Sequence, residues 1–219
     1  MEIKACIFDL DGTLLNTLST ITYYVNSALA RAGAVPITEE KCREMVGKGA
    51  RNLLSRAIAE TGAQVMDFED FFASYNLEYN AAPDYLTAPY AGIAEVIEKI
   101  SAAGIRIAVL SNKPEGAVRP LAEKFFGNRV SIVAGAKPGV PLKPDPAAVA
   151  PILSMLGVCA EQTAFIGDSG EDMQTAKKYG AGCAIGVLWG YRNEKELSSQ
   201  GADFLAKTPA DILAALGIS

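Results

Sequence analysis

Short apolar segments alternate with helix-patterned segments over most of the chain that follows Gly92. The apolar runs show no polar alternation, which is typical of strands whose two faces are both buried. We expect strands at residues 3–8, 105–110, 130–133, 164–166, 182–187 and 204–205. The expected intervening helices span residues 93–104, 115–126, 146–156, 171–179, 194–197 and 210–216. This alternation predicts an α/β fold in which a doubly wound parallel sheet forms a Rossmann-like core.

A purely helical pattern separates the first expected strand from the rest of the sheet. Apolar residues recur at helical spacing near residues 18–29, 39–46, 53–58 and 68–79, without a strand signal between them. We therefore expect two domains. Residues 1–15 and 86–219 would form the α/β core, and residues 16–85 a helical cap domain inserted after the first strand.

The chain has no histidine among its 219 residues. This excludes Ser-His-Asp and Cys-His catalysis, histidine-ligated zinc sites and phosphohistidine mechanisms. Acid–base chemistry must then come from carboxylates, lysine, tyrosine or cysteine. The net charge of −5 argues against nucleic acid or an anionic membrane as a partner, since both usually bind clustered lysine and arginine.

The cysteines and the N-terminal segment indicate a cytoplasmic protein. Cys6, Cys42, Cys159 and Cys183 are widely spaced, form no Cys-x-x-Cys pair, and are expected to be reduced core residues. The N-terminus does not resemble a signal peptide. No apolar run has the roughly 18–20 residues needed to span a bilayer, so we expect no membrane partner. The pattern makes no prediction about oligomeric state.

Four polar clusters directly follow expected strands. They are Asp-Leu-Asp-Gly-Thr at residues 9–13, Ser-Asn-Lys at 111–113, Lys-Pro at 143–144 and Gly-Asp-Ser-Gly-Glu-Asp at 167–172. Parallel α/β sheets bind ligands at the carboxyl ends of their strands. We therefore expect the four clusters to converge on one site.

Converging carboxylates in this site would require a cation. Asp9, Asp11, Asp168 and Asp172 would repel one another, since two unit charges 4 Å apart cost about 4 kcal/mol at an effective dielectric near 20. Carboxylate oxygens without histidine or cysteine nearby favour Mg²⁺. Lys143 would add a fixed positive charge.

The same residues suit phosphoryl transfer. Ser111 or Thr13 would donate a hydrogen bond to a phosphoryl oxygen, with Asn112 as a further candidate. Asp9, kept ionised by the metal and a lysine, is expected to be the nucleophile. Asp11 is expected to be the general acid and base, a role typically worth about 10²–10⁴-fold in rate.

The four clusters resemble the four motifs of the haloacid dehalogenase-like hydrolase superfamily, in the same order and at similar spacing. The resemblance covers nearly the whole chain. It narrows to the phosphoglycolate phosphatase-like branch through Pro89-Tyr90 before Gly92, residues 168–176, and Gly-Val-Leu-Trp-Gly-Tyr at 186–191 followed by Gly-Ala-Asp at 201–203. A departure is Asn16, where many relatives carry Asp; Asn16 would still cap the first cap helix.

The resemblance implies a set of metal ligands. Mg²⁺ would be held by the side chains of Asp9 and Asp168 and by the backbone carbonyl of Asp11. Asp172 would orient water on the metal, with Ser169 beside it. An acid at Asp11 indicates phosphate-ester hydrolysis, because dehalogenase and phosphonatase members lack it.

The resemblance also implies that Ser111 and Lys143 bind the phosphoryl group and that the helical insertion is a mobile cap. Within the insertion, Gly47-Lys48-Gly49 is the best candidate for specificity. The glycines would let the backbone approach a ligand, while Lys48 or Arg51 would supply charge for a carboxylate. The alternative is a helix-to-helix turn with an exposed lysine. Trp189 and Tyr191 are expected to pack or close a loop.

These features predict a Mg²⁺-dependent phosphatase that hydrolyses a small phosphate monoester, with 2-phosphoglycolate as leading substrate, through an aspartyl-phosphate intermediate. Within the superfamily the alternatives are an inorganic pyrophosphatase and a β-phosphoglucomutase-like sugar-phosphate enzyme. From another class, the alternative is a non-enzymatic phosphoryl-responsive module resembling a receiver domain. Receivers place the phosphorylated aspartate after an internal strand and have no such insertion.

Overall fold

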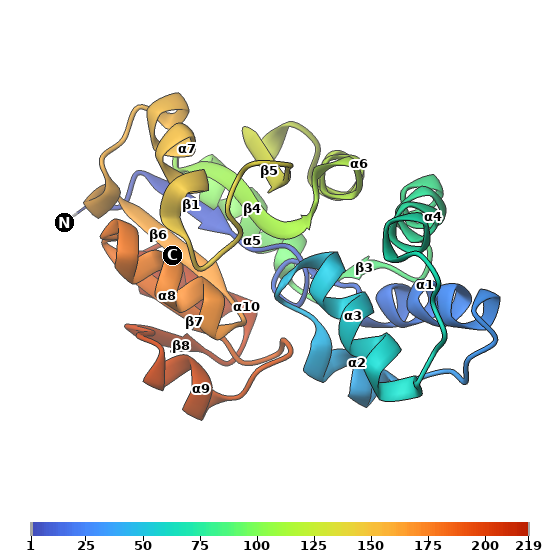
Figure 1. The fold of residues 1–219 in the computed structure, drawn as a ribbon. Coiled ribbons are helices and arrows are strands. Elements are labelled where there is room, and N and C mark those ends of the chain that lie inside the picture. The colour runs from blue at the N-terminus through green and yellow to red at the C-terminus, as the bar shows by residue number, and fades with distance from the viewer. Residues whose placement is uncertain (1, 219) are drawn as a thin grey trace.

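A parallel sheet of six strands forms the core of the protein in the computed structural model, which describes residues 2–218 (Figure 1). The strand order is β5-β4-β1-β6-β7-β8, and every neighbouring pair is parallel. This confirms the predicted doubly wound α/β fold. The strands are β1 (Ala5–Phe8), β4 (Arg106–Pro114), β5 (Ile132–Ala136), β6 (Thr163–Gly167), β7 (Cys183–Val187) and β8 (Phe204–Ala206).

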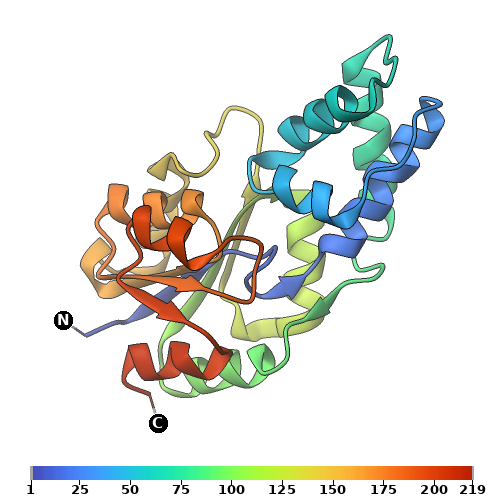
Figure 2. The ribbon, with the colours of Figure 1, turned by 90° about the horizontal axis from the view of Figure 1, so that it is seen from below.

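Helices cover both faces of this sheet (Figure 2). One face packs against α5 (Ile93–Ala102), α6 (Glu115–Phe126) and α10 (Pro209–Leu216). The other packs against α7 (Val149–Leu156), α8 (Gly170–Tyr179) and α9 (Glu194–Ser199). Adjacent residues of β1 show the division, since Ile7 belongs to one apolar cluster and Phe8 to the other. Both side chains are buried, which explains why the strand segments are continuously apolar.

The helical insertion forms an apolar cluster of its own, here called the cap. Its helices are α1 (Leu18–Arg31), α2 (Glu39–Met45), α3 (Gly49–Thr61) and α4 (Phe68–Ala81), so all four predicted helices are present. Thr38 caps α2 by accepting from the backbone N–H of Lys41. The expectation that Asn16 caps α1 was wrong, because the N-cap position is occupied by Thr17.

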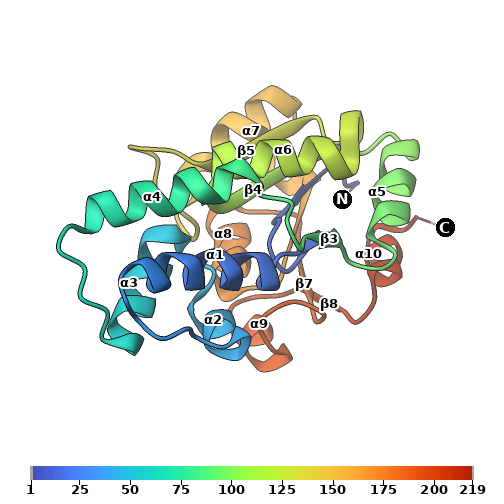
Figure 3. The same cartoon turned by 90° about the vertical axis from the view of Figure 1, so that its right-hand side faces the viewer.

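A two-stranded sheet that the sequence did not predict joins the cap to the core. Strand β2 (Leu15–Asn16) pairs antiparallel with β3 (Ala88–Pro89), and the two lie side by side at the base of the cap (Figure 3). Two residues are too few to show a strand period, so the pairing leaves no signal in the sequence. The chain thus enters and leaves the cap at adjacent points.

Two further sequence expectations need correction. The strand expected at 105–110 continues as β4 to Pro114, with a register shift against β5 between Leu110 and Pro114. Residues 111–113 are therefore part of the irregular end of a strand rather than a loop after it. All four cysteines are free, but Cys159 is exposed and Cys183 only half-buried, so these two are not core residues.

Among residues 2–218, no helix combines the length and the apolar content required for a membrane span.

Replacement of a fully buried side chain on the face covered by α5 should destabilise the protein strongly. We expect Ile97→Ala to lower the free energy of unfolding by about 2–5 kcal/mol, because it removes buried methyl groups and leaves a cavity. Leu77→Ala removes a side chain that is 77% exposed and should change stability by less than about 0.5 kcal/mol. Urea unfolding followed by circular dichroism measures both values. Equal effects would contradict the assignment of Ile97 to the core.

Candidate active site

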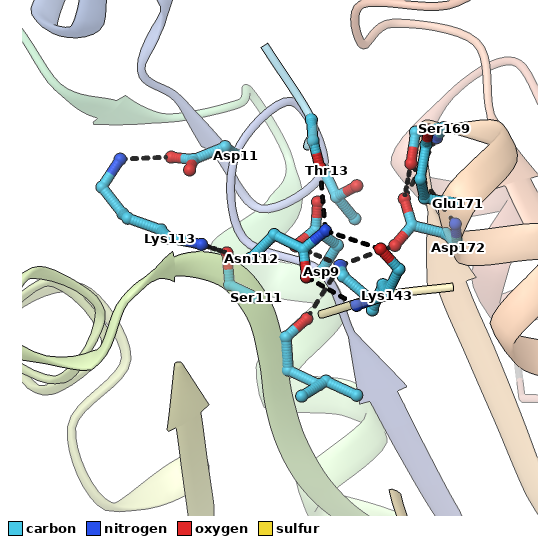
Figure 4. Close-up of polar contacts among 12 residues, drawn as sticks. Asp9, Asp11, Thr13, Ser111, Asn112, Lys113, Lys143, Ser169, Glu171 and Asp172 are labelled. Atoms are coloured by element: carbon cyan, nitrogen blue, oxygen red, sulfur yellow. Dashed lines mark hydrogen bonds and ion pairs between the residues drawn. The ribbon is translucent and has the colours of Figure 1, made fainter. Parts of the chain in front are cut away.

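Three buried carboxylates meet at the carboxyl ends of the central strands. Figure 4 labels two of them, Asp9 and Asp172. Asp9 follows β1, Asp168 follows β6, and Asp172 lies in the first turn of α8. One oxygen of each lies within 4.8 Å of the others. The predicted convergence therefore occurs for these three residues, but the carboxylate of Asp11 is not a member of the group.

The ammonium group of Lys143 lies among these carboxylates. Its Nζ is 2.8 Å from Oδ1 of Asp9 and 2.7 Å from Oδ1 of Asp172. It also donates to the backbone carbonyl of Leu110 at 3.0 Å. The contact with Asp9 is an ion pair, and Oδ1 of Asp9 has no hydrogen-bond partner among residues 2–218. The side chain is only 3% exposed, which places this positive charge inside the protein.

Asn112 holds the backbone of Lys143 in place. Its amide oxygen accepts from the backbone N–H of Lys143 at 2.8 Å, and its amide nitrogen donates to the carbonyl of the same residue at 3.0 Å. The amide nitrogen also donates to the carbonyl of Gly47 in the cap at 2.8 Å. With these contacts the Asn112 side chain connects β4, the Lys143 loop and the cap.

Burial dominates the electrostatics of the cluster. It raises the pKa of Asp9 to about 7, against the lowering influence of Lys143. Burial also raises the pKa of Asp168, and the neighbouring Asp9 and Asp172 raise it further. For Lys143, burial acts to lower the pKa, but Asp172 and Asp9 raise it overall. The cluster thus combines a charged lysine with two carboxyl groups, Asp9 and Asp168, whose raised pKa values a further cation would lower.

The surroundings of Asp168 fit a bound metal ion. A Cβ built on Gly12 would lie 2.3 Å from Oδ2 of Asp168, and one on Gly190 would lie 2.3 Å from its Cβ, so both positions exclude a side chain. Asp168 is held by the hydroxyl of Thr13 at 3.1 Å and the backbone N–H of Tyr191 at 2.7 Å. A closely packed, all-oxygen donor set of this kind suits a hard divalent cation.

Asp172 is fixed by its own helix start. Its Oδ2 accepts from the hydroxyl of Ser169 at 2.6 Å and from the backbone N–H of the same residue at 3.1 Å. In return the Ser169 side chain caps α8. Asp172 therefore presents its Oδ1 to Lys143 in a fixed orientation.

Asp11 faces a different group of residues. Its Oδ1 accepts from the hydroxyl of Thr17 at 2.7 Å and from Nζ of Lys113 at 2.8 Å. Figure 4 shows its carboxylate directed toward Lys113 and away from the Lys143 cluster. Asp11 thus lies outside the group of three carboxylates, although its charge still contributes to raising the pKa of Asp9. The Asp9 side chain contacts Lys143 and the Asp11 side chain contacts Lys113, so the two carboxylates have different chemical environments.

A cavity between core and cap opens onto these residues. Its core side includes Asp9, Asp11, Ser111 and Lys143. Its cap side is mainly apolar and is formed by Ile21, Val46, Leu53, Tyr75 and Tyr79, with the backbone at Gly47 and Gly49.

The two cap residues expected to bind substrate do not line this cavity. Arg51 pairs with Glu69, and its guanidinium carbon lies 4.3 Å from the ring centroid of Phe72. Lys48 is 64% exposed and lies 3.7 Å from Glu171 of the core. The glycines on either side of Lys48 do line the cavity, so the backbone of this turn, rather than its charged side chain, faces the site.

Four residues contribute contacts that the sequence argument did not assign. Thr17 and Lys113 hold Asp11, as described above. The hydroxyl of Tyr191 lies 2.9 Å from that of Thr17, and Tyr191 lines the cavity instead of only closing a loop. Arg192 donates to the carbonyls of Arg43 and Val46 at the end of α2, at 2.8 and 2.6 Å. The position of Lys113 in the Ser-Asn-Lys cluster was a sequence signal that it lies near the site. The contacts of Thr17, Tyr191 and Arg192 depend on how cap and core pack, so no signal in the sequence indicated them.

The neighbouring Trp189 closes the same loop over the strand ends, since its indole N–H donates to the carbonyl of Thr13 at 3.1 Å. This contact agrees with the expectation that Trp189 packs.

Comparison with known proteins gives a consistent result. The model of a family described as haloacid dehalogenase-like hydrolase matches residues 6–185. A phosphoglycolate phosphatase of Rhodospirillum rubrum is 37% identical over 212 residues, which cover 91% of this chain and 85% of that protein. A crystal structure described as a predicted phosphoglycolate phosphatase from Haemophilus somnus is 27% identical, with a TM-score of 0.91 and 98% of each chain covered. CbbY from Rhodobacter sphaeroides, crystallised in complex with phosphate, is 25% identical, with a TM-score of 0.83, over 99% of this chain and 100% of that one.

The glycine beside Asp168 should be required for cation binding. Gly12→Ala places a methyl group against the Asp168 carboxylate and strains a backbone with φ of +83°. Gly33→Ala is a matched control, because its φ is +68° and its Cβ would have no neighbour within 4 Å. We expect each variant to lose about 1–2 kcal/mol through backbone strain. Only Gly12→Ala should also lose the stabilisation by MgCl₂, which thermal unfolding with and without the salt measures. Full stabilisation of Gly12→Ala would contradict the proposed ligand position.

Cation binding should release protons and strengthen as the pH rises. The pKa of Asp9 is raised from 3.8 to about 7 by burial, so the metal-free native state retains a proton that the unfolded chain loses at lower pH. The metal-free protein should therefore become less stable between about pH 4 and pH 7, and the affinity for Mg²⁺ should increase over the same interval. Calorimetric titration in two buffers of different ionisation enthalpy measures the released protons. Proton release that is absent at about pH 6 would contradict this expectation.

Proposed function

The chain belongs to the haloacid dehalogenase-like hydrolases, and we propose that it is a Mg²⁺-dependent phosphatase that hydrolyses a small phosphate monoester. The observation that carries this proposal is the contact of Asp9 with Lys143, beside Asp168 and at the base of the cavity under the cap. The leading substrate is 2-phosphoglycolate, which the names of the Rhodospirillum and Haemophilus relatives support.

In this proposal the side chains of Asp9 and Asp168 and the backbone carbonyl of Asp11 hold the metal ion. When bound, Mg²⁺ neutralises charge on the phosphoryl oxygens and keeps the carboxylates ionised. Asp172 orients Lys143 and would orient a water molecule next to the metal. The proximity of the Asp9 and Asp168 carboxylates supports their binding of one ion.

The chain's own residues then divide the reaction between them. Asp9 attacks phosphorus to form an aspartyl phosphate, and the bond between phosphorus and the ester oxygen breaks. Asp11 donates a proton to the departing alcohol and afterwards accepts one from the water that hydrolyses the aspartyl phosphate. Lys143 contributes positive charge and Ser111 a hydrogen bond to the phosphoryl group. The hydroxyl of Thr13, which the sequence also suggested for this role, donates instead to Asp168 and so positions that carboxylate. The product is inorganic phosphate, and Asp9 is regenerated.

Asn112 is better suited to positioning than to binding phosphate. Its amide oxygen and nitrogen are already used by the backbones of Lys143 and Gly47. We infer that Asn112 fixes Lys143 for the reaction without contacting the phosphoryl group itself. A cytoplasmic location remains our inference, supported by the four free cysteines.

Removal of the nucleophile should abolish turnover. We expect Asp9→Asn to reduce kcat for 2-phosphoglycolate by about 10⁴-fold or more at saturating Mg²⁺, because the amide oxygen does not form the covalent intermediate. Asp70→Asn removes an exposed carboxylate of α4 and serves as the matched control with unchanged activity. Phosphate release measures both. Retained activity in Asp9→Asn would refute its assignment as nucleophile.

A panel of 2-phosphoglycolate, pyrophosphate and hexose phosphates tests the substrate with the wild-type protein. Preferential release of phosphate from 2-phosphoglycolate supports the proposal. Preference for pyrophosphate, or transfer of phosphate between sugar hydroxyls, would replace it by one of the two alternatives in the same family. A long-lived phosphoprotein without turnover would favour the non-enzymatic alternative.

A further inference from the structure

Three basic side chains line the cavity, and two of them have several partners in the protein. Lys143 donates to Asp172 and to the carbonyl of Leu110, and it forms an ion pair with Asp9. Arg192 donates to two carbonyls of the cap, and its Nε forms an ion pair with Glu196 at 3.7 Å. Protein contacts therefore hold each of these two charged groups in three directions.

The third basic side chain, Lys113, has unused hydrogen-bond donors. Its Nζ donates to Oδ1 of Asp11 at 2.8 Å and lies 4.7 Å from the ring centroid of Tyr79. It makes no other hydrogen bond to a described residue, although the side chain is only 5% exposed. An ammonium group has three donors, and leaving two without an acceptor in a buried setting is costly.

A second unpartnered donor lies in the same wall of the cavity. The hydroxyl of Tyr79 is buried and has no hydrogen-bond partner among residues 2–218, while Tyr79 as a whole is 4% exposed. Tyr79 stands on α4 of the cap, whereas Lys113 stands on β4 of the core. The wall therefore brings together a core cation with unused donors and a cap hydroxyl without a partner among the described residues.

We infer that Lys113, assisted by Tyr79, recognises a negatively charged group on the leaving alcohol of the substrate. This inference rests on the proposed phosphatase function. In the proposed reaction the alcohol oxygen takes a proton from Asp11 and therefore lies at hydrogen-bond distance from the Asp11 carboxylate. The Lys113 ammonium group also lies at hydrogen-bond distance from the Asp11 carboxylate. A charge that reaches Lys113 is thus separated from the ester oxygen by about one or two carbon atoms. The substrate class is a phosphate monoester of a short 2-hydroxycarboxylate.

A different role for Lys113 would be to hold Asp11 and nothing more. In that case its loss would slow every monoester equally, because Asp11 acts on the leaving oxygen of all of them. Recognition of the leaving group, in contrast, affects only substrates that carry the negative charge. The two roles are therefore separated by the ratio of kcat/KM for two substrates of equal shape.

The experiment compares 2-phosphoglycolate with its neutral amide, O-phosphoglycolamide, in wild-type protein, Lys113→Met and Lys113→Gln. The charged substrate should lose about 10–100-fold more kcat/KM than the amide in both variants, the effect of one lost hydrogen bond to a charged group. Lys113→Gln keeps a donor for Asp11 and so preserves its position if the Met variant folds poorly. Arg51→Met is the matched control, since it removes a cation that lies outside the cavity and should leave the ratio unchanged.

An equal loss for both substrates would overturn the inference and assign Lys113 to the support of Asp11. Equal activity of the wild-type protein on the two substrates would also overturn it, while the phosphatase function would stand. Failure of the wild-type protein to release phosphate from any monoester would instead refute the proposed function.

Discussion

The buried ammonium group of Lys143 is the contact on which the rest of the site depends. Three buried carboxylates would otherwise share a volume only a few ångströms wide, at a cost of about 4 kcal/mol for each close pair. Lys143 reduces this repulsion but does not remove it, because burial still raises the pKa of Asp9 and of Asp168. A second cation would reduce the remaining repulsion, and the three carboxylates lie close enough together to hold one.

Glycine and backbone contacts make this crowding possible. A side chain on Gly167 would place its Cβ 2.4 Å from the Cβ of Asp172, and Gly12 and Gly190 exclude side chains next to Asp168. The loop that contains Gly190 continues to Tyr191 and Arg192, which contact Asp168 and α2 respectively. The carboxylate cluster and the cap are thus connected through a few consecutive residues of one core loop.

Features that depend on neighbouring residues in the sequence or on the general rules of a parallel sheet could be predicted, whereas features that depend on particular contacts between distant residues could not. The strands could be predicted because both faces are buried, so that Ile7 and Phe8 are apolar even though they point into different clusters. The meeting of Asp9 with Lys143 followed from parallel strands that end at one edge. The environment of Arg51 could not be predicted, because it depends on the packing of α3 against α4 and not on the neighbouring glycine-rich turn. The engagement of Lys113 by Asp11 likewise joins residues that are 102 positions apart.

The pairing of β2 with β3 has a consequence for the history of the chain. Because the two crossings between core and cap are hydrogen-bonded neighbours, the ends of the inserted segment lie next to each other. Insertions whose ends are adjacent on the surface are tolerated best, since the host sheet does not have to change to accommodate them. One segment of the gene, residues 16 to 87, thus encodes the apolar cavity wall, while the clustered carboxylates are encoded outside it. Recombination at these two positions would exchange the apolar wall of the cavity and leave the carboxylates, Lys143 and Lys113 of the core in place.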